Sequence, residues 1–198
     1  MGVLLTQTIK KVGWVREWVV KVNRIRSAWM LREVKRSLDL GDKKVLDVGT
    51  GLGGVAYLLN KAGSKVTSVD INNVCLEKGV KVNIYDGKTL KFPDKSFDAG
   101  LLLFVLHHTP NPETVLKEVT RVSKRVVIME DVFSNWLSKY WTFFIDSLGN
   151  LEFSGHPHTN KRDEVWRNLF RRLGYKLKEV RIFSEHLGVK RILYCLDS

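Results

Sequence analysis

A glycine-rich turn directly after a short apolar run constrains this chain more than any other feature. The run Val45–Val48 leads into four glycines within six residues, and apolar residues at helical spacing begin immediately afterwards at Val55. Glycine allows a tight turn and brings backbone N–H groups against a ligand that any Cβ would exclude. A helix that begins there adds unpaired N–H donors and the positive end of its dipole. The sequence therefore predicts a strand, a turn and a helix that together bind a nucleotide-like group.

Two acidic residues near this turn narrow the choice of ligand. Three of the glycines also fit the dinucleotide fingerprint G-x-G-x-x-G, which chance glycine turns match as well. A second predicted strand, Val66–Val69, ends at Asp70, about 20 residues past the glycines, where a carboxylate can bind ribose hydroxyls. Asp47 stands two residues before the first glycine. The pattern indicates a ligand that carries a ribose.

From residue 43 the chain alternates strand and helix patterns, as expected for the parallel sheet of an α/β fold. Further strands are predicted at Val80–Ile84, Ala99–Phe104 and Val126–Met129, with two closing strands near the end of the chain. Helices are predicted at Asn72–Gly79, from Asn111 onward with Pro112 in the first turn, and over about Lys161–Leu173.

The segment Leu90–His108, LKFPDKSFDAGLLLFVLHH, carries the most specific pattern. It resembles the corresponding stretch of the quinone- and small-molecule-directed branch (methyltransferase type 11-like) of the class I S-adenosylmethionine (SAM)-dependent methyltransferases. The helix around Trp166 is similar to the last helix of that family. The resemblance implies a Rossmann-like, doubly wound α/β fold with a mostly parallel seven-stranded sheet whose last strand is antiparallel. Residues 43–198 would form the SAM-binding domain, and residues 1–42 an N-terminal helical extension or lid.

The same resemblance implies the residues that bind SAM and its product S-adenosylhomocysteine (SAH). They are Asp47, Gly49, Thr50, Gly51, Gly53, Asp70, Ile71, Asp86, Gly87, Leu103 and Phe104. The glycine turn would contact the methionine part of the cofactor, with Asp47 orienting its amino-acid end. Leu103 and Phe104 would lie near the sulfur and the methyl acceptor.

The two remaining acidic residues would hold the nucleoside. Asp70 would accept hydrogen bonds from both ribose hydroxyls, an arrangement suited to a carboxylate. Ile71 would pack on the adenine ring, and Asp86, beside Gly87, would accept from its amino group. The alternatives are that Asp70 only caps the next helix and that Asp86 is an ordinary turn residue.

Methyl transfer is an in-line displacement, so an enzyme chiefly holds the acceptor close, aligned and dry. A base is needed only where the acceptor atom carries a proton. His107 and His108 follow the fourth strand and are the candidate catalytic residues, with Glu130 and Asp131, expected at the carboxyl end of the fifth strand, as further proton acceptors. The alternative is that both histidines are structural or solvated loop residues.

Several other chemistries are disfavoured by what surrounds these motifs. The fourth strand lacks the Asn/Asp-Pro-Pro-aromatic motif of amino-methylating enzymes. His156 and His158 have no cysteine or acidic cluster at metal-ligand spacing, so no metal site is predicted. The segment Phe92–His108 argues against a nicotinamide dehydrogenase, and the retained acidic and glycine residues argue against a non-enzymatic binding module.

Positive charge is concentrated at the two ends of the chain. The net charge is +12, of which residues 1–40 carry +6 (nine basic, three acidic) and residues 150–198 carry +4 (ten basic, six acidic). Such ends suit an acidic substrate, RNA or an anionic membrane surface, or simply a solvated surface. The alternative function is therefore an RNA-directed methyltransferase or an RNA-binding protein. No run has the length of a membrane span, and the two cysteines are far apart, so a cytoplasmic protein is expected.

The first 40 residues predict two amphipathic helices. Apolar residues recur at Val12, Val15, Trp18 or Val19, Val22, Ile25 and Trp29. This stripe is expected to pack on the protein's own domain; the alternatives are a membrane-surface helix and a partner-binding helix. All six tryptophans lie outside the nearly neutral middle of the chain, and residues 133–144 are rich in aromatic side chains. The placement of the tryptophans favours a small or mid-sized acceptor with an apolar or aromatic surface, whereas residues 133–144 are expected to form a packed helix, with a wall of the substrate site as the alternative. The oligomeric state stays open.

Overall fold

The computed structural model describes residues 3–133, 161–186 and 189–197. The predicted aromatic segment 133–144 and the pair His156 and His158 lie almost wholly outside these residues. In chain order the elements are α1 (Val3–Lys11), α2 (Gly13–Lys35), β1 (Lys44–Val48), α3 (Gly54–Lys61), β2 (Lys65–Asp70), β3 (Val82–Ile84), β4 (Ala99–Leu103), the short 3₁₀ helix η1 (Leu106–His108), α4 (Pro112–Val122), β5 (Arg125–Phe133), α6 (Asp163–Arg172), β6 (Lys176–His186) and β7 (Val189–Asp197).

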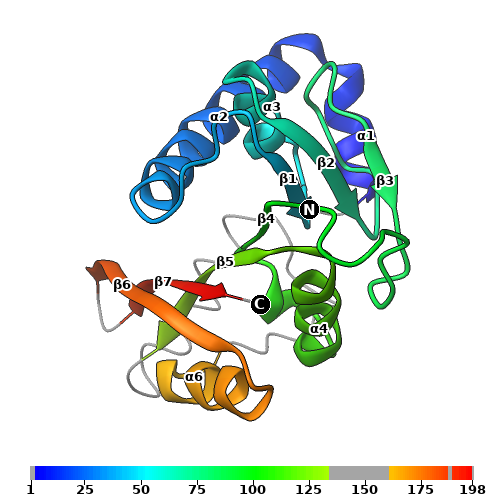
Figure 1. The fold of residues 1–198 in the computed structure, drawn as a ribbon. Coiled ribbons are helices and arrows are strands. Elements are labelled where there is room, and N and C mark those ends of the chain that lie inside the picture. The colour runs from blue at the N-terminus through cyan, green and yellow to red at the C-terminus, as the bar shows by residue number, and fades with distance from the viewer. Residues whose placement is uncertain (1–2, 134–160, 187–188, 198) are drawn as a thin grey trace.

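The strands form one seven-stranded sheet in the order β3-β2-β1-β4-β5-β7-β6. The neighbours from β3 to β5 pair in parallel, and β7 runs antiparallel to both β5 and β6. Helices α2 and α3 lie on one side of this sheet, and α4 and α6 on the other (Figure 1). The predicted Rossmann-like, mostly parallel fold with an antiparallel last strand is confirmed.

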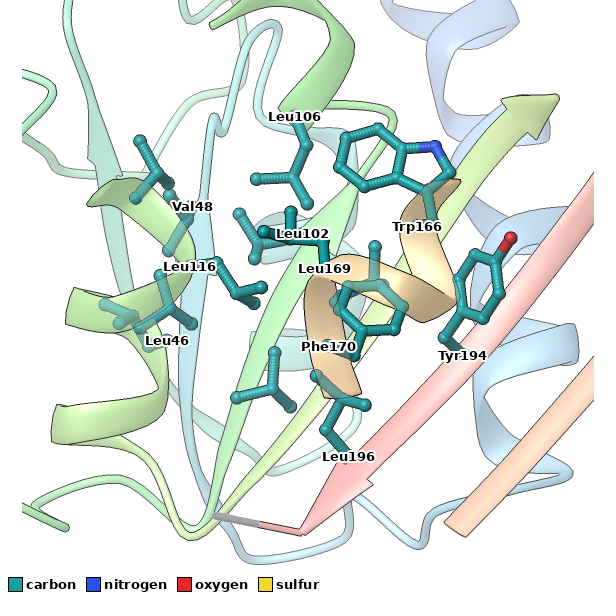
Figure 2. Packing of buried hydrophobic residues seen from close by; sticks show 14 of the residues in the cluster. Leu46, Val48, Leu102, Leu106, Leu116, Trp166, Leu169, Phe170, Tyr194 and Leu196 are labelled. Carbon is teal, nitrogen blue, oxygen red and sulfur yellow. The ribbon is translucent and has the colours of Figure 1, made fainter. Parts of the chain in front are cut away.

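Alternate residues of the central strands fill two separate apolar layers, as required of a sheet covered on both faces. In β1, Leu46 and Val48 join the layer under α4 and α6, whereas Val45 joins the layer under α2 and α3. Figure 2 shows the first layer, in which Trp166 and Phe170 of α6 stack near Tyr194 of β7. Trp166 is fully buried and is therefore a core residue of this layer.

The N-terminal helices pack on the domain, and part of the predicted stripe takes part in this packing, since Val15 and Trp29 are partly buried against the core. Helix α2 buries Val20, Ser27, Met30, Leu31, Glu33 and Val34. Trp18 and Ile25 of the predicted stripe are 64% and 65% exposed. The predicted stripe follows one apolar periodicity along the helix. Helix α2 has apolar residues on two sides of its axis, and most of its buried residues lie on the other side.

Residues 71–81 form no helix, contrary to the prediction for Asn72–Gly79. The Asn73 side chain accepts a hydrogen bond from the backbone N–H of Cys75, a local bond that competes with helix formation. Cys75 and Leu76 are buried, and Leu76 packs with Ile9 of α1 and Val20 of α2. In place of the predicted helix, the chain forms an irregular segment that is buried under the N-terminal helices.

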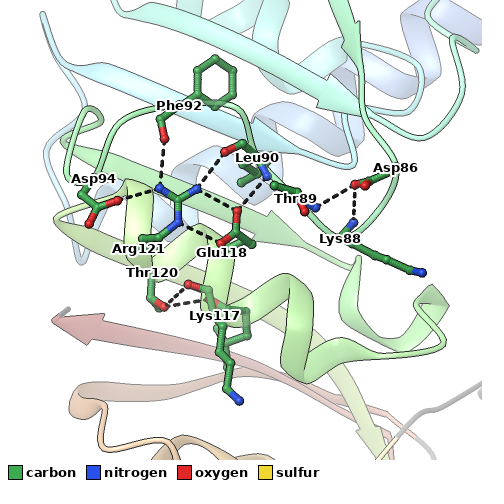
Figure 3. Close-up of polar contacts among 11 residues, drawn as sticks. Asp86, Lys88, Thr89, Leu90, Phe92, Asp94, Lys117, Glu118, Thr120 and Arg121 are labelled. Atoms are coloured by element: carbon green, nitrogen blue, oxygen red, sulfur yellow. Dashed lines mark hydrogen bonds and ion pairs between the residues drawn. The ribbon is translucent and has the colours of Figure 1, made fainter.

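Helix α4 begins as predicted, because the Asn111 side chain accepts from the Thr114 N–H and Pro112 stands in the first turn. Its last turn carries Arg121, which organises the segment that leads into β4 (Figure 3). The guanidinium donates to the carbonyl oxygens of Leu90 and Phe92 at 2.8 and 3.0 Å and pairs with Glu118 and with Asp94. The Leu90 N–H in turn donates to Glu118 at 2.8 Å, so two side chains of α4 hold this segment (Figure 3).

Candidate functional site

The topology brings the predicted site residues to one edge of the sheet. β2, β1 and β4 are neighbours and parallel, so their carboxyl ends, with Asp70, Gly49 and Leu103, lie at the same edge. In an open α/β sheet this is where ligands bind. The strand order in the sheet runs β3-β2-β1 and then β4, so the direction in which the chain winds changes between β1 and β4. The predicted site residues therefore lie at the edge of the sheet where ligands of such folds bind.

The glycine turn between β1 and α3 depends on glycine for both conformation and space. Gly49, Gly51 and Gly53 have φ angles of 71°, 53° and 91°. A Cβ on Gly49 would lie 2.6 Å from a methyl group of Val105, and one on Gly53 would lie 2.5 Å from the Cys75 sulfur. These positions are closed to other residues, since their backbone is left-handed and their surroundings are filled.

Asp47 is a buried carboxylate at the end of β1, with only 3% of its surface exposed. Its Oδ2 atom has no hydrogen-bond partner among the residues that the structure describes. Burial raises the pKa of Asp47 to about 7, and the nearby charge of Asp70 acts in the same direction. A buried acceptor without a donor is the natural partner of a cationic or N–H-bearing ligand group.

Asp70 is the last residue of β2, and its carboxylate connects the glycine turn to the segment that follows β2. Its Oδ2 accepts from the Gly51 N–H at 2.8 Å, and its Oδ1 accepts from the Asn72 N–H at 3.2 Å. Each carboxylate oxygen has a second lone pair available for a ligand hydroxyl. The alternative of a helix cap does not apply in the expected form, because no helix follows at residues 71–81.

The side chains next along this edge form a partly apolar shelf. Ile71 is 52% exposed, and a Cβ on Gly87 would lie 3.3 Å from its Cγ2 methyl. Asp86 is exposed, and its Oδ1 accepts from the N–H groups of Lys88 and Thr89 at 2.8 and 2.7 Å (Figure 3). These bonds lower the pKa of the Asp86 carboxyl, so it is ionised at neutral pH. Asp86 can be a turn residue and also bind a ligand, because both hydrogen bonds of the turn are accepted by Oδ1.

At the end of β4 the backbone turns sharply and is covered by the N-terminal helix α2. Phe104 has a φ of 59°, and its N–H donates to the Met129 carbonyl at 2.7 Å. The Arg26 guanidinium of α2 lies 5.5 Å from the Phe104 ring centroid. Leu103 and Phe104 are both half-buried. Residues 1–42 thus contribute to the surroundings of the candidate site.

The two histidines occupy different environments. His107 is 1% exposed, and its Nδ1 lies 2.5 Å from Glu130 Oε2, while Oε1 of the same carboxylate accepts from the Leu106 N–H at 2.8 Å. His108 is half-buried, and its ring centroid is 4.0 Å from that of His107. Glu130 is fully buried inside β5, because this strand continues to Phe133. The expectation that Glu130 and Asp131 stand at the strand's carboxyl end is therefore wrong.

Three contacts around the site were not foreseen from the sequence: Val105 on Gly49, Cys75 on Gly53, and Arg26 over Phe104. Val105 follows β4 directly, so a bulky residue after that strand was an available signal. Cys75 and Arg26 offered none, because their contacts join segments about 20 and about 80 residues apart along the chain.

The comparisons with known proteins agree with this geometry. Residues 46–128 match the profile of the methyltransferase domain family. A demethylmenaquinone methyltransferase of Thermotoga maritima is 32% identical over 160 residues, which cover 69% of this chain and 69% of that protein. This chain belongs to the class I SAM-dependent methyltransferases. A ubiquinone/menaquinone biosynthesis C-methyltransferase of Desulfotalea psychrophila is 27% identical over 195 residues, covering 82% of this chain and 79% of that protein.

These relatives place the methyltransferase in the quinone-type branch, as the segment Leu90–His108 indicated. The fold agrees too: a SAM-dependent methyltransferase from Archaeoglobus fulgidus superimposes with a TM-score of 0.67 at 19% identity, covering 92% of this chain and 94% of that chain. The predicted enzyme class is confirmed, and the RNA-directed alternative is not favoured. Within residues 3–133, 161–186 and 189–197, no helix has the length and apolar character to cross a bilayer, and no three potential metal ligands gather.

Proposed function

We propose that this methyltransferase transfers the methyl group of SAM to a ring carbon of a quinone precursor. The observation that carries the proposal is the 32% identity to a demethylmenaquinone methyltransferase over 69% of that protein. A second relative is described as a C-methyltransferase of quinone biosynthesis. A ring of this kind has the small, apolar and aromatic surface that the sequence favoured.

The residues at the sheet edge fit the cofactor. The unpartnered Asp47 Oδ2 suits the ammonium of the methionine part, and the open space at Gly51, where a Cβ would meet only the Gly49 carbonyl oxygen at 3.9 Å, suits its close approach. Asp70 would hold the ribose hydroxyls, Ile71 would cover one face of the adenine, and Asp86 would accept from its amino group. When bound, SAM supplies an electrophilic methyl on a positively charged sulfur. The chain's own task is to orient donor and acceptor and to exclude water.

The acceptor would lie beside Leu103 and Phe104, where a ring can pack on apolar side chains. Transfer to a ring carbon forms a carbon–carbon bond and breaks the sulfur–carbon bond, after which the ring carbon loses its proton. His108, half-buried next to this edge, is the candidate to receive a proton. His107 would act with it or support it, held by the two bonds that Glu130 makes to the same short helix.

Residues 1–42 would act as a cover for this site. Leu52 of the glycine turn packs with Ile9 of α1 and Val20 of α2, and Arg26 reaches the Phe104 ring. A cover that is packed on the turn itself would exclude water from the transferring methyl group.

The proposal is tested by cofactor binding and by methyl transfer. Asp70→Ala should weaken SAH binding in calorimetry by roughly a hundredfold, because two charge-assisted hydrogen bonds are lost. Asp70→Asn keeps the side-chain oxygen for the Gly51 N–H, so it separates loss of charge from loss of the turn. Glu164→Ala, on the exposed side of α6, is the matched control. Unchanged affinity of both Asp70 variants would contradict the site.

For the acceptor, labelled methyl groups from SAM should enter a reduced demethylated naphthoquinone and not RNA. The label should stay on the ring after mild base, which distinguishes a C-methyl from an ester. Incorporation into RNA alone, with none in any quinone precursor, would assign the enzyme to the other acceptor class.

A further inference from the structure

The first half of α2 carries a row of apolar side chains that nothing in the described structure covers. Trp14 and Trp18 are 76% and 64% exposed, and Val22 and Ile25 are 47% and 65% exposed. These four residues, here called the outer face of α2, fall within an arc of about 80° around the helix axis. Four adjacent exposed apolar residues, two of them tryptophan, form a patch rather than scattered surface residues.

The outer face is not a failed core contact, because α2 already has a separate buried side. Val20, Ser27, Leu31 and Val34 lie on the opposite side of the axis and are all buried. Arg24 fixes the rotation of the helix from one flank, since it makes two hydrogen bonds with Glu77, at 2.8 and 2.7 Å, and stacks on Tyr57. The helix therefore cannot turn its tryptophans inward without breaking buried contacts.

The charges around the outer face are mostly basic. Lys21 and Arg32 are exposed on its flank, and Lys10 and Lys11 end α1 just before it. Beside it, α2 borders a groove of about 670 Å³. The groove is lined by Arg16, Lys21, Arg24 and Lys78 with only two acids, Glu17 and Glu77, a balance of +2. Tryptophan next to lysine and arginine is the composition that binds the interface of an anionic bilayer.

We propose that the outer face of α2 docks this methyltransferase on an anionic lipid membrane, lying in the headgroup region without crossing it. The tryptophans would enter the boundary between headgroups and acyl chains, and the flanking bases and groove would meet lipid phosphates. A second copy of the chain is a poorer occupant, because two segments of net charge +6 would face each other. A protein partner is also a poorer occupant, since lysine is depleted in such interfaces.

This inference stands independently of the acceptor, although an acceptor with a lipid-soluble tail would lie in the same membrane. It can fail while the proposed function holds, because SAH binding and methyl transfer to a short-chain acceptor need no bilayer.

The test is co-sedimentation of the full chain with vesicles. We expect binding to an equal mixture of phosphatidylcholine and phosphatidylglycerol, and binding at least tenfold weaker to phosphatidylcholine alone, from about fivefold per basic residue. Trp14→Ala/Trp18→Ala should reduce binding to the mixed vesicles by roughly tenfold or more. Lys21→Glu/Arg32→Glu should abolish the preference for the anionic lipid.

Val165→Ala, which removes an exposed apolar residue on α6, is the control and should bind vesicles like the original protein. Unchanged circular dichroism and SAH affinity would show that the tryptophan variant is folded. Equal sedimentation of the original and the tryptophan variant, or no binding to either vesicle, would overturn the proposal. So would a dimer in sedimentation velocity that the tryptophan variant dissociates, because the outer face would then belong to a second copy.

Discussion

At the scale of single residues, the site combines a buried carboxylate with a backbone that only glycine can adopt. Asp47 shows the consequence most clearly. Its burial beside the glycine turn raises its pKa to about 7, so it changes charge close to neutral pH. The charged form of this buried carboxylate destabilises the folded protein when no ligand is bound, and it favours the binding of a cationic ligand.

The charge of Asp47 should make stability depend on pH in one direction. An unfolded aspartate has a pKa near 3.9, so between about pH 4 and pH 7 the folded state holds a proton that the unfolded state has lost. Stability therefore falls as pH rises through this window and is constant with respect to this group above it. Asp47→Asn should remove the fall and raise the free energy of unfolding at pH 8, on the order of 4 kcal/mol. Urea denaturation of the original protein and of Asp47→Asn at pH 5 and pH 8 measures both effects. An equal change in the free energy of unfolding between the two pH values in both proteins would contradict the assignment.

At the scale of elements, the site is built by packing between helices that are distant in sequence. Helix α3 begins at Gly54, and a Cβ there would collide with the side chains of Asn23 and Ser27 on α2. The glycine thus serves the approach of the two helices as well as the turn. On the other face of the sheet, Arg121 plays an equivalent role for the segment before β4.

Gly54→Ala should destabilise the protein by about 1–2 kcal/mol, although alanine is the better helix former by about 1 kcal/mol. The reason is the collision with α2. In the background Asn23→Ala/Ser27→Ala the same change should be neutral or stabilising, and the double-mutant cycle in urea unfolding gives the coupling. An equal cost in both backgrounds would place the effect in the turn itself.

Arg121→Ala should cost about 2 kcal/mol, because it leaves the carbonyls of Leu90 and Phe92 without their donor and removes the ion pair with Glu118. Lys117→Ala, on the same helix and paired with Glu113 near the surface, should change stability by less than about 0.5 kcal/mol. Chemical denaturation of the original protein and of the two variants measures their free energies of unfolding. Similar losses for the two variants would mean that Arg121 acts only as a surface charge.

At the scale of the whole molecule, one sheet edge brings together the glycine turn, the acidic residues and Arg26 of α2, so a ligand bound there would contact several distant segments of the chain. SAH at a hundred times its dissociation constant should stabilise the fold by about 2.7 kcal/mol. For a chain of this size that is a rise in melting temperature of roughly 5–10 °C. NAD at the same concentration should leave the melting temperature unchanged. A shift with NAD and none with SAH would reverse the assignment of the glycine turn.

Short-range patterns were sufficient for the order of strands and helices, for the glycine turn with Asp47 and Asp70, and for the start of α4 at Asn111. Each of these depends on local backbone preference, on periodicity or on neighbours a few residues apart. The same patterns failed for residues 71–81, where burial under α1 and α2 outweighs a weak helical preference.

Tertiary structure alone decided the roles that require two distant segments. Apolar periodicity marks the sides of α2 but not which of them meets the sheet, since both carry large apolar residues. Likewise, the sequence places His107 after β4 and Glu130 in β5, whereas their 2.5 Å contact exists only because the two strands are parallel neighbours. Local chemistry therefore determined the family of this protein and the residues proposed to bind its cofactor, and packing over long sequence distances determined which residues are buried and which remain on the surface.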